Sequence, residues 1–390
     1  GFQRWTRTID PSDGATIEVV LPIPGFSESV AVSGRRLEEE LPQLIERTGV
    51  RVQTISAAQI ENGGYYDVGQ ALQTLVPGLF LVPKAGPFDY VDASFQGSRT
   101  NEILWMVDGV RISNRLYNGT TPLDTIPAHM IERVEIIEGG QGLFYGTQAV
   151  AGAVNVVTKS LAETFDGGVQ SGFDSNRGRH INLFARDSVG GHKFVAFAST
   201  DNAEGYRNFP LEQYQPTATD RRRSYDVLTL GGKYAYDVTA GLRLSASYQR
   251  TDGKLDNLRP GRSGAAHVGS LAEGFNDRNE HLLSAKVDYT ARRTAQLFFK
   301  TYYHHWDTQF TERRNVVGSP GLSRYSSNGD FWGFKDYGAN LLARLAPTKQ
   351  VEYFAGYDFQ NYRGRDDVLL IAPNTETVHA LFGQVRTTPA

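Results

Sequence analysis

The side chains that could do chemistry in this sequence are histidines and carboxylates near the ends of expected strands. His304 and His305 are followed by Trp306 and Asp307, a set that could contact a metal or a metal chelate. Adjacent residues of a strand point to opposite faces, so both histidines cannot bind one ion unless the strand bulges. We therefore interpret this stretch as an interfacial aromatic cluster rather than a metal site.

Paired carboxylates lie in two expected loops. Asp252 with Asp256, and Asp366 with Asp367, could bind Ca²⁺ through their oxygen atoms, although solvated loop charge is the interpretation that we favour. Apart from this Ca²⁺ in outer loops, we expect no cofactor and no metal ligand.

No catalytic motif accompanies these residues. The sequence contains no G-x-S-x-G, H-E-x-x-H or P-loop pattern, and Gly140-Gln141-Gly142 lacks the third glycine of a dinucleotide-binding turn. We therefore expect no catalytic residue and no enzyme activity.

The composition narrows the class of protein. With a net charge of -3 over 390 residues, no global basic field recommends nucleic acid as a partner. The absence of cysteine removes disulfides and thiolate metal sites from consideration. The sequence contains no run of about 18 apolar residues, so it predicts no transmembrane helix. The strands of a membrane barrel alternate, so the mean hydropathy of -0.38 is compatible with a barrel or with a soluble protein.

The elements up to residue 160 predict a small α/β domain around a four-stranded sheet. Two helices are expected, at 57–61 after the N-cap Ser56 and at 67–75 before Pro77-Gly78. Asp108-Gly109 predicts a tight hairpin, because a left-handed turn favours these two residue types. The expected strands are 91–95, 103–107, 133–138 and 149–157, the last two separated by the glycine-rich turn 139–146.

After Lys159, segments of about ten residues with period-2 alternation recur, which is typical of a membrane β-barrel. Leu242, Leu244, Ala246 and Tyr248 would face lipid, whereas Arg243, Ser245, Ser247 and Gln249 would face the lumen. Short connections alternate with long ones (202–221, 252–276, 309–330 and 363–375). Tyrosines near strand ends suit aromatic girdles (Tyr234, Tyr236, Tyr289, Tyr302, Tyr303, Tyr353 and Tyr357). The ten expected strands are 165–174, 178–188, 192–201, 222–236, 241–251, 277–291, 294–308, 331–346, 349–362 and 376–387.

Four motifs in order carry a family resemblance: Leu75-Val76-Pro77-Gly78, Phe95-Gln96-Gly97-Ser98-Arg99, Val107-Asp108-Gly109-Val110-Arg111 and the stretch 131–159. Together they resemble the plug domain of the TonB-dependent outer-membrane receptors, of the siderophore and cobalamin type. The sequence departs from the family pattern at Gln96, where arginine is common, and at Glu138-Gly139-Gly140, where Arg-Gly-Pro is common.

The resemblance implies a mainly β fold in four parts. Residues 1–26 resemble the end of a small β-sandwich domain similar to carboxypeptidase regulatory domains, and 27–44 are a TonB-box-like segment (Glu28, Ser29, Val30, Ala31 and Val32) with a linker. The plug domain spans 45–160, and 161–390 form the N-terminal part of an antiparallel transmembrane β-barrel. Because barrels that hold a folded plug have about 22 strands, we expect the ten strands to be part of a truncated barrel.

The resemblance also implies a function, which is TonB-dependent import of a ferric siderophore or cobalamin across the bacterial outer membrane. The expected partners are a TonB-type energy-coupling protein, outer-membrane lipid with lipopolysaccharide, and a small metal chelate, but no nucleic acid. Arg221-Arg222-Arg223 could attract an anionic ligand, although we favour a basic rim that faces lipopolysaccharide phosphates. The alternative function is a plugged barrel that signals, or anchors a complex, without transport. The expected ligand contacts at the plug apex are Pro87, Phe88, Asp89, Tyr90, Arg115, Leu116, Tyr117 and Asn118.

Overall fold

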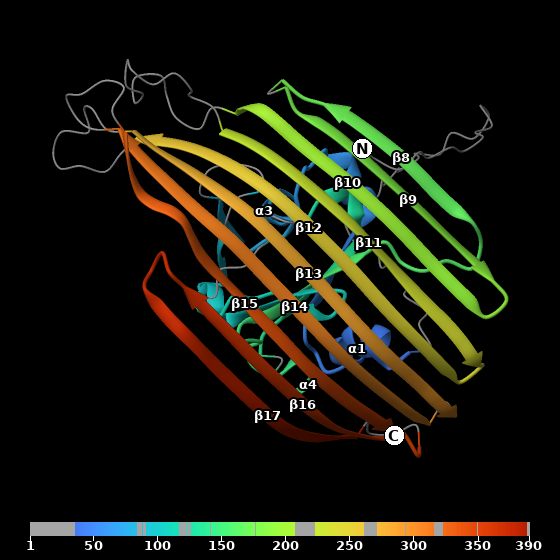
Figure 1. The fold of residues 1–390 in the computed structure, drawn as a ribbon. Coiled ribbons are helices and arrows are strands. Elements are labelled where there is room, and N and C mark those ends of the chain that lie inside the picture. The colour runs from blue at the N-terminus through green and yellow to red at the C-terminus, as the bar shows by residue number, and fades with distance from the viewer. Residues whose placement is uncertain are drawn as a thin grey trace, which may run out of the picture.

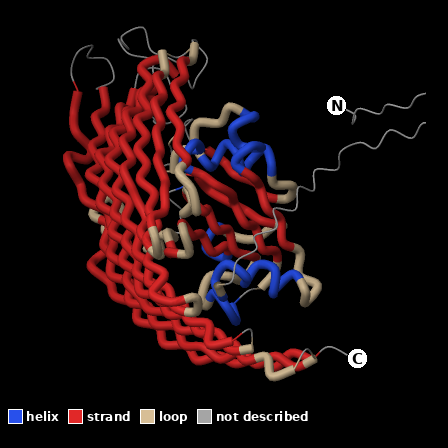
Figure 2. The backbone as a smooth tube through the Cα atoms, turned by 90° about the vertical axis from the view of Figure 1, so that its right-hand side faces the viewer, coloured by secondary structure: helices blue, strands red, loops and turns tan. Residues whose placement is uncertain are grey.

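A small α/β domain lies against the concave face of a ten-stranded antiparallel sheet in the computed structural model (Figures 1 and 2). We call the domain the plug and the sheet the wall. The structure describes residues 36–83, 88, 91–116, 123, 126–140, 142–175, 177–206, 223–260, 271–292, 294–315, 323–348 and 350–387. The predicted N-terminal β-sandwich and the TonB-box-like segment therefore lie outside the described residues.

Each wall strand pairs only with its sequence neighbours, and β8 and β17 are the two edges (Figure 1). Among the described residues no pairing joins these two edges, so the wall is an open sheet there. The strands are β8 (Asp166–Phe173), β9 (Arg179–Val189), β10 (His192–Tyr206), β11 (Arg223–Thr239), β12 (Leu242–Pro260), β13 (Leu271–Arg292), β14 (Ala295–Asn315), β15 (Ser323–Leu345), β16 (Val351–Asp366) and β17 (Ile371–Thr387).

The ten predicted segments correspond to these ten strands, but the strands run further at their outer ends. β12 continues to Pro260, which places Asp252 and Asp256 inside a strand and not in the predicted outer loop. The predicted long loop 363–375 is also wrong, because β16 ends at Asp366 and β17 begins at Ile371. Apolar alternation marks only the part of a strand that contacts lipid, so it stops before the hydrogen-bonded strand does.

The predicted alternation of inner and outer side chains is confirmed. Leu244 and Tyr248 are exposed on the outer face, whereas Arg243 and Gln249 are buried toward the plug. Tyr302 is an exception to the predicted girdle, since it is 5% exposed and belongs to the core that the plug shares with the wall. Its position follows from strand geometry, because Tyr302 and Tyr303 are adjacent and point to opposite faces.

The plug is built on a five-stranded mixed sheet of order β1-β6-β7-β4-β5, not on the four strands predicted. Its central strands are buried on both faces, and all five residues of β4 are buried. Three of the predicted strands are in this sheet as β4, β6 and β7, whereas the predicted strand 91–95 pairs elsewhere. The two members that were not predicted are β1 and β5; β5 is two residues long and closes the Asp108-Gly109 hairpin onto β4. The strands are β1 (Val52–Ser56), β4 (Ile103–Val107), β5 (Val110–Arg111), β6 (Ile131–Glu138) and β7 (Gly152–Thr158); β2 (Leu79–Pro83) and β3 (Val91–Phe95) form a separate hairpin.

Helices cover the plug sheet, and both predicted helices are present. α2 (Ala57–Gly63) begins with a capping box between Ser56 and Gln59, and α3 (Val68–Leu75) is capped by Asp67. Short turns complete the plug at η1 (Thr100–Glu102), η3 (Ala128–Met130) and α4 (Gly142–Tyr145). No helix in the described part of the chain is long and apolar enough to cross a membrane.

A helix that was not predicted, α1 (Leu37–Glu46), occupies the segment expected to be a linker up to residue 44. Pro42 inside the helix hides it from sequence reasoning, because proline normally ends a helix. Leu37, Leu41, Leu44 and Ile45 are nevertheless spaced on one face and all are buried. They pack with wall residues Phe298, Leu342 and Phe354, so α1 attaches to the wall as well as to the plug.

Candidate functional site

The hairpin at Asp108-Gly109 attaches the plug to the wall through hydrogen bonds from wall lysines. Asp108 has a φ of 49° and Gly109 a φ of 75°, the left-handed turn that the sequence predicts. A side chain at position 109 would also bring its Cβ within 2.5 Å of Glu38 Oε1 and 2.8 Å of Lys300 Nζ. Gly109 therefore suits the left-handed backbone at this position, and a side chain here would have to displace the flexible ends of Glu38 and Lys300.

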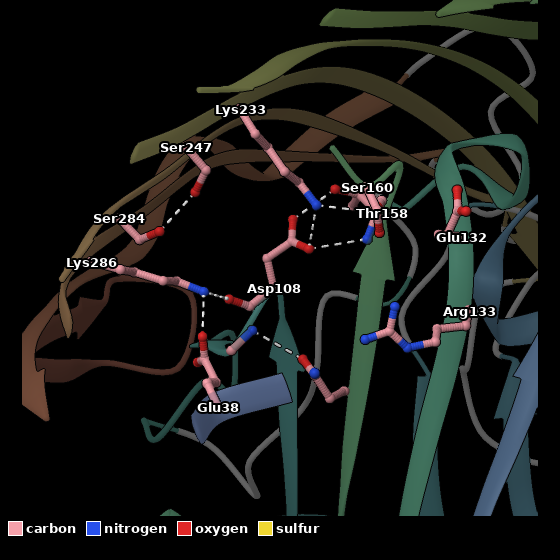
Figure 3. A network of polar contacts seen from close by, with 12 residues as sticks. Glu38, Asp108, Glu132, Arg133, Thr158, Ser160, Lys233, Ser247, Ser284 and Lys286 are labelled. Carbon is pink, nitrogen blue, oxygen red and sulfur yellow. Dashed lines mark hydrogen bonds and ion pairs between the residues drawn. The ribbon is translucent and has the colours of Figure 1, made fainter. Parts of the chain in front are cut away.

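Glu38 in the first turn of α1 lies between two wall lysines on the neighbouring strands β13 and β14. Lys286 Nζ donates to Glu38 Oε2 at 2.7 Å, and Lys300 Nζ donates to Glu38 Oε1 at 2.8 Å. The same ammonium groups also donate to the hairpin, Lys286 to Asp108 O at 3.0 Å and Lys300 to Gly109 O at 2.7 Å. α1, the hairpin and two wall strands thus share one polar contact. Figure 3 shows the part of it that Lys286 makes with Glu38 and Asp108.

A third wall lysine, Lys233 of β11, binds the side chain of Asp108. Its Nζ lies 2.7 Å from Asp108 Oδ1 and 3.0 Å from Thr158 O. Thr158 completes the contact, because its hydroxyl donates to Asp108 Oδ2 at 2.6 Å (Figure 3). We call Glu38, Asp108, Lys233, Lys286 and Lys300 the latch.

The latch determines the charge state of its two carboxylates. Burial alone would raise the pKa of Glu38, but Lys286 and Lys300 overcome it and lower the pKa to about 2. Burial likewise opposes ionisation of Asp108, but Lys233 and the hydrogen bond from Thr158 lower the pKa of that carboxyl. Both groups are therefore ionised near neutral pH, and each neutralises part of the wall's positive charge.

A cavity of about 610 Å³ lies beside the latch, between the plug and the wall. It is lined by plug residues that include Glu38 and Asp108 and by wall residues that include Lys233 and Lys286. Ser247 and Ser284 line its far side and hydrogen-bond to each other at 2.7 Å (Figure 3). Four of the five latch residues, Glu38, Asp108, Lys233 and Lys286, therefore border this space on the inner face of the wall.

At the opposite end of the plug, Phe88 is buried, whereas the prediction had an exposed side chain; its contact with a ligand stays a prediction. It is fully buried in a cluster with Tyr225, Val227 and Leu255 of the wall, and its ring centroid lies 5.0 Å from that of Tyr225. Arg278 Nη1 donates to Phe88 O at 3.3 Å. Phe88 therefore attaches the plug to the wall, because burial in this cluster removes the apolar surface of its ring from water.

We expect Asp67→Ala to release the Phe88 anchor and to weaken α3, with a combined loss of about 2 kcal/mol. Asp67 Oδ1 accepts from Gln70 N and Oδ2 from Phe88 N, both at 2.8 Å. Hydrogen exchange should accelerate at the amides of Gln70 and Phe88. Asp67→Asn is the matched control, because its amide oxygen can still cap α3 but its amide nitrogen cannot accept from Phe88 N. In this variant exchange should accelerate at Phe88, to the same extent as in Asp67→Ala, but not at Gln70. Unchanged exchange at both amides in Asp67→Ala would contradict the role given to Asp67.

Arg115 is held in a polar cluster on the inner face of the wall. Its side chain is 7% exposed, with Nη2 3.7 Å from Asp336 Oδ2 and Nη1 3.2 Å from Glu376 Oε2. Nη2 also donates to Gln360, and the guanidinium carbon lies 5.4 Å above the ring of Tyr362. Arg115 therefore fastens the loop after β5 to β15, β16 and β17, where the prediction had a free side chain.

The remaining predicted residues divide into three groups. Leu116 is half-buried against the wall cluster of Trp306, Phe334 and Tyr362. His304 is buried and contacts Glu280 at 2.9 Å, whereas His305 stacks on His281, so the two histidines do point to opposite faces. Other predicted contacts lie outside the described residues: Glu28 to Val32, Pro87, Asp89, Tyr90, Tyr117, Asn118, Arg221 and Arg222.

No three metal-ligating side chains gather among the residues that the structure describes. Asp252 is engaged by Arg250 and by Asn279, whose Nδ2 donates at 2.7 Å, and Asp367 lies 3.5 Å from Arg365. Binding of Ca²⁺ by these carboxylates stays a prediction.

The two departures from the family pattern contact each other. Gln96 Nε2 donates to Glu138 Oε2 at 2.8 Å, and Arg51 Nη1 lies 3.4 Å from Glu138 Oε1. Sequence reasoning noted both positions but not their contact, because 42 residues separate them. The latch was also missed: alternation predicts that Lys233, Lys286 and Lys300 point inward, but it does not identify partners on the plug.

Comparison with known proteins gives a consistent result. Residues 45–153 match the family model described as TonB-dependent Receptor Plug Domain. The vitamin B12 transporter BtuB of Vibrio vulnificus is 30% identical over 301 residues, which cover 67% of this chain and 48% of that protein. An iron-regulated outer membrane virulence protein of Vibrio cholerae is 32% identical over 138 residues, or 33% of this chain and 20% of that protein.

Solved structures share the fold. The ferric citrate transporter FecA in its unliganded form has a TM-score of 0.57 at 12% identity, over 86% of this chain and 60% of that chain. The ferric preacinetobactin receptor BauA from Acinetobacter baumannii has a TM-score of 0.54 at 14% identity, over 85% and 60%. The chain spans about half the length of the curated transporters that it matches, 48% and 49% of the first two.

Proposed function

The chain belongs to the TonB-dependent receptors, and we propose that the protein imports a scarce ligand, a ferric siderophore or cobalamin, across the bacterial outer membrane. This proposal rests on the position of the plug, which lies against the inner face of the wall (Figure 2). Separable ion pairs fasten it there at Glu38 and Asp108, beside a cavity. A plug held in this way obstructs passage at rest and can yield when those pairs break.

The protein resides in the bacterial outer membrane, with the apolar outer face of the wall in lipid. Leu244, Tyr248, Leu283 and Tyr289 are each between 43% and 46% exposed on that face, and polar side chains alternate with them on the inner face. Lipopolysaccharide would contact the same outer surface.

A TonB-type energy-coupling protein is the partner that would drive the cycle. It would pair with the segment 27–34 by strand addition and pull on it. α1 begins at Leu37, directly after that segment, so tension would reach Glu38 within the first turn of the helix. Ligand bound at the outer face would have to change the availability of the segment on the far side, which requires two states of the plug.

We expect deletion of residues 27–34 to abolish uptake while leaving ligand binding intact, because the deletion removes the point of traction and no described wall contact. The measurement is accumulation of radiolabelled ferric citrate and cyanocobalamin by cells that carry the complete receptor, alongside equilibrium binding to the purified protein. Retained uptake would refute the role of this segment. Binding without uptake in the intact receptor would instead favour a signalling or anchoring role.

A further inference from the structure

The two sides of the cavity beside the latch carry opposite charge. Wall strands contribute four basic side chains and one acidic one, namely Lys193, Lys233, Arg243, Lys286 and Asp288. Plug residues contribute mostly carboxylates, among them Glu38, Asp108, Glu132 and Glu135. Opposite charges on facing surfaces attract, so this arrangement holds the plug against the wall.

Three wall lysines have their partners on the plug: Lys233 and Lys286 of the cavity lining, and Lys300, which is paired with Lys286 on the neighbouring strand. Lys233 contacts Asp108 and Thr158, Lys286 contacts Glu38 and Asp108, and Lys300 contacts Glu38 and Gly109. Lys193 and Arg243 differ, because both have an acidic partner within the wall, Asp237. When the plug moves, the three latch lysines are the group that loses its counter-charges.

Exposed to the lumen without counter-charges, these lysines would repel one another and attract anions. They lie on β11, β13 and β14, with Ser247 of β12 and Ser284 of β13 between them, so they form a continuous polar strip on one side of the lumen. A surface lined by one sign of charge concentrates the opposite ion. Asp288, on the same face of β13 as Lys286, is the acidic wall residue in the cavity lining and offsets only part of this charge.

We propose that Lys233, Lys286 and Lys300 form a track for anionic ligands, and that the carboxylates of Glu38 and Asp108 occupy it until the plug moves. This inference rests on the proposed import function and narrows its substrate to metal chelates with net negative charge, such as ferric complexes of carboxylate or catecholate chelators. An anionic ligand replaces the two carboxylates as the partner of the lysines, so its passage offsets the cost of separating buried charges. A neutral ligand provides no such replacement.

The test is ion selectivity of the complete receptor in planar bilayers under a KCl gradient. Glu38→Ala with Asp108→Ala removes the carboxylates that occupy the track, and we expect a conductance that prefers chloride over potassium by about fivefold or more. Adding Lys233→Gln, Lys286→Gln and Lys300→Gln should return the ratio to about one. Lys254→Gln with Lys335→Gln, on exposed side chains of the wall's outer face, is the matched control and should leave the preference unchanged.

Glu38→Gln with Asp108→Asn repeats the experiment with side chains of nearly the same size, in case the alanine variant does not assemble. A conductance without ion preference, a preference for potassium, or no rise in conductance in the assembled variants would each overturn the track. The import function fails separately, if cells with the intact receptor accumulate neither radiolabelled ferric citrate nor cyanocobalamin. Uptake that persists while chloride selectivity is absent would leave import standing and remove the track.

Discussion

Replacement of Glu38 by glutamine is expected to weaken attachment of the plug to the wall by about 2–3 kcal/mol. The two lysines lower the pKa of Glu38 from 4.5 to about 2. Solvent screening reduces the free energy that corresponds to this shift, because 24% of the Glu38 side chain is exposed. Hydrogen exchange at the amide of Gly109, which donates to Asn155, should accelerate by about 30- to 150-fold. Glu46→Gln, at the exposed end of α1, is the matched control and should change nothing.

The same ion pairs make plug attachment depend on pH. Because the pKa of Glu38 is lowered in the attached state, its contribution is complete above about pH 4.5 and is lost as the pH falls toward 2. Asp108, whose pKa Lys233 also lowers against the effect of burial, acts in the same direction. The difference in Gly109 exchange between the wild type and Glu38→Gln should therefore shrink between pH 4.5 and 2.5. A difference that stays constant over this range would show that the charge of Glu38 is not what attaches α1.

The second large effect is expected from Arg115→Ala, which should destabilise the outer attachment of the plug by about 3 kcal/mol or more. The substitution leaves Asp336, which is 1% exposed, without the guanidinium that lies 3.7 Å away. It also removes the cation from the face of Tyr362, which donates its hydroxyl proton to Asn114 at 2.9 Å. Exchange at the amide of Arg115 and the melting temperature of the purified receptor are the readouts.

Two further variants separate charge from shape at this position. Asp336→Asn combined with Arg115→Ala should recover much of the loss, because no uncompensated charge then remains buried. Arg115→Lys keeps the charge but lacks the planar fork that reaches Gln360 and Asp336 together, so it should recover only part. A double variant as unstable as Arg115→Ala alone would contradict the ion-pair explanation.

The fold could be predicted from local signals wherever a single face of an element decides its position. Alternation predicted the wall strands, as exposed Leu244 and buried Gln249 illustrate, and the caps Ser56 and Asp67 predicted the plug helices. α1 was not predicted, because Pro42 within it favours the end of a helix, although the apolar residues of α1 share one buried face. The outer strand ends escaped because polar side chains above the lipid carry no periodic signal.

The functional contacts were less accessible to sequence reasoning, because they join residues far apart in the chain. Phe88 and Arg115 were predicted to be exposed loop residues in contact with a ligand, yet the side chains of both are buried against the wall. What a loop side chain contacts depends on the surface opposite to it, and that surface here comes from wall strands that lie far along the chain. Ligand contact by the predicted apex residues stays a prediction.

The pairing order of the wall has a consequence for how the molecule assembles. Every wall strand binds its immediate successor, so the sheet can grow by adding one hairpin at a time through local contacts. The plug has no such path: Arg386 donates to Leu44 O across 342 residues, and this bond awaits β17. Because the plug precedes the wall in the chain, its attachment at Leu44 can be completed only after β17 has been synthesised, whereas the sheet itself can form from local contacts.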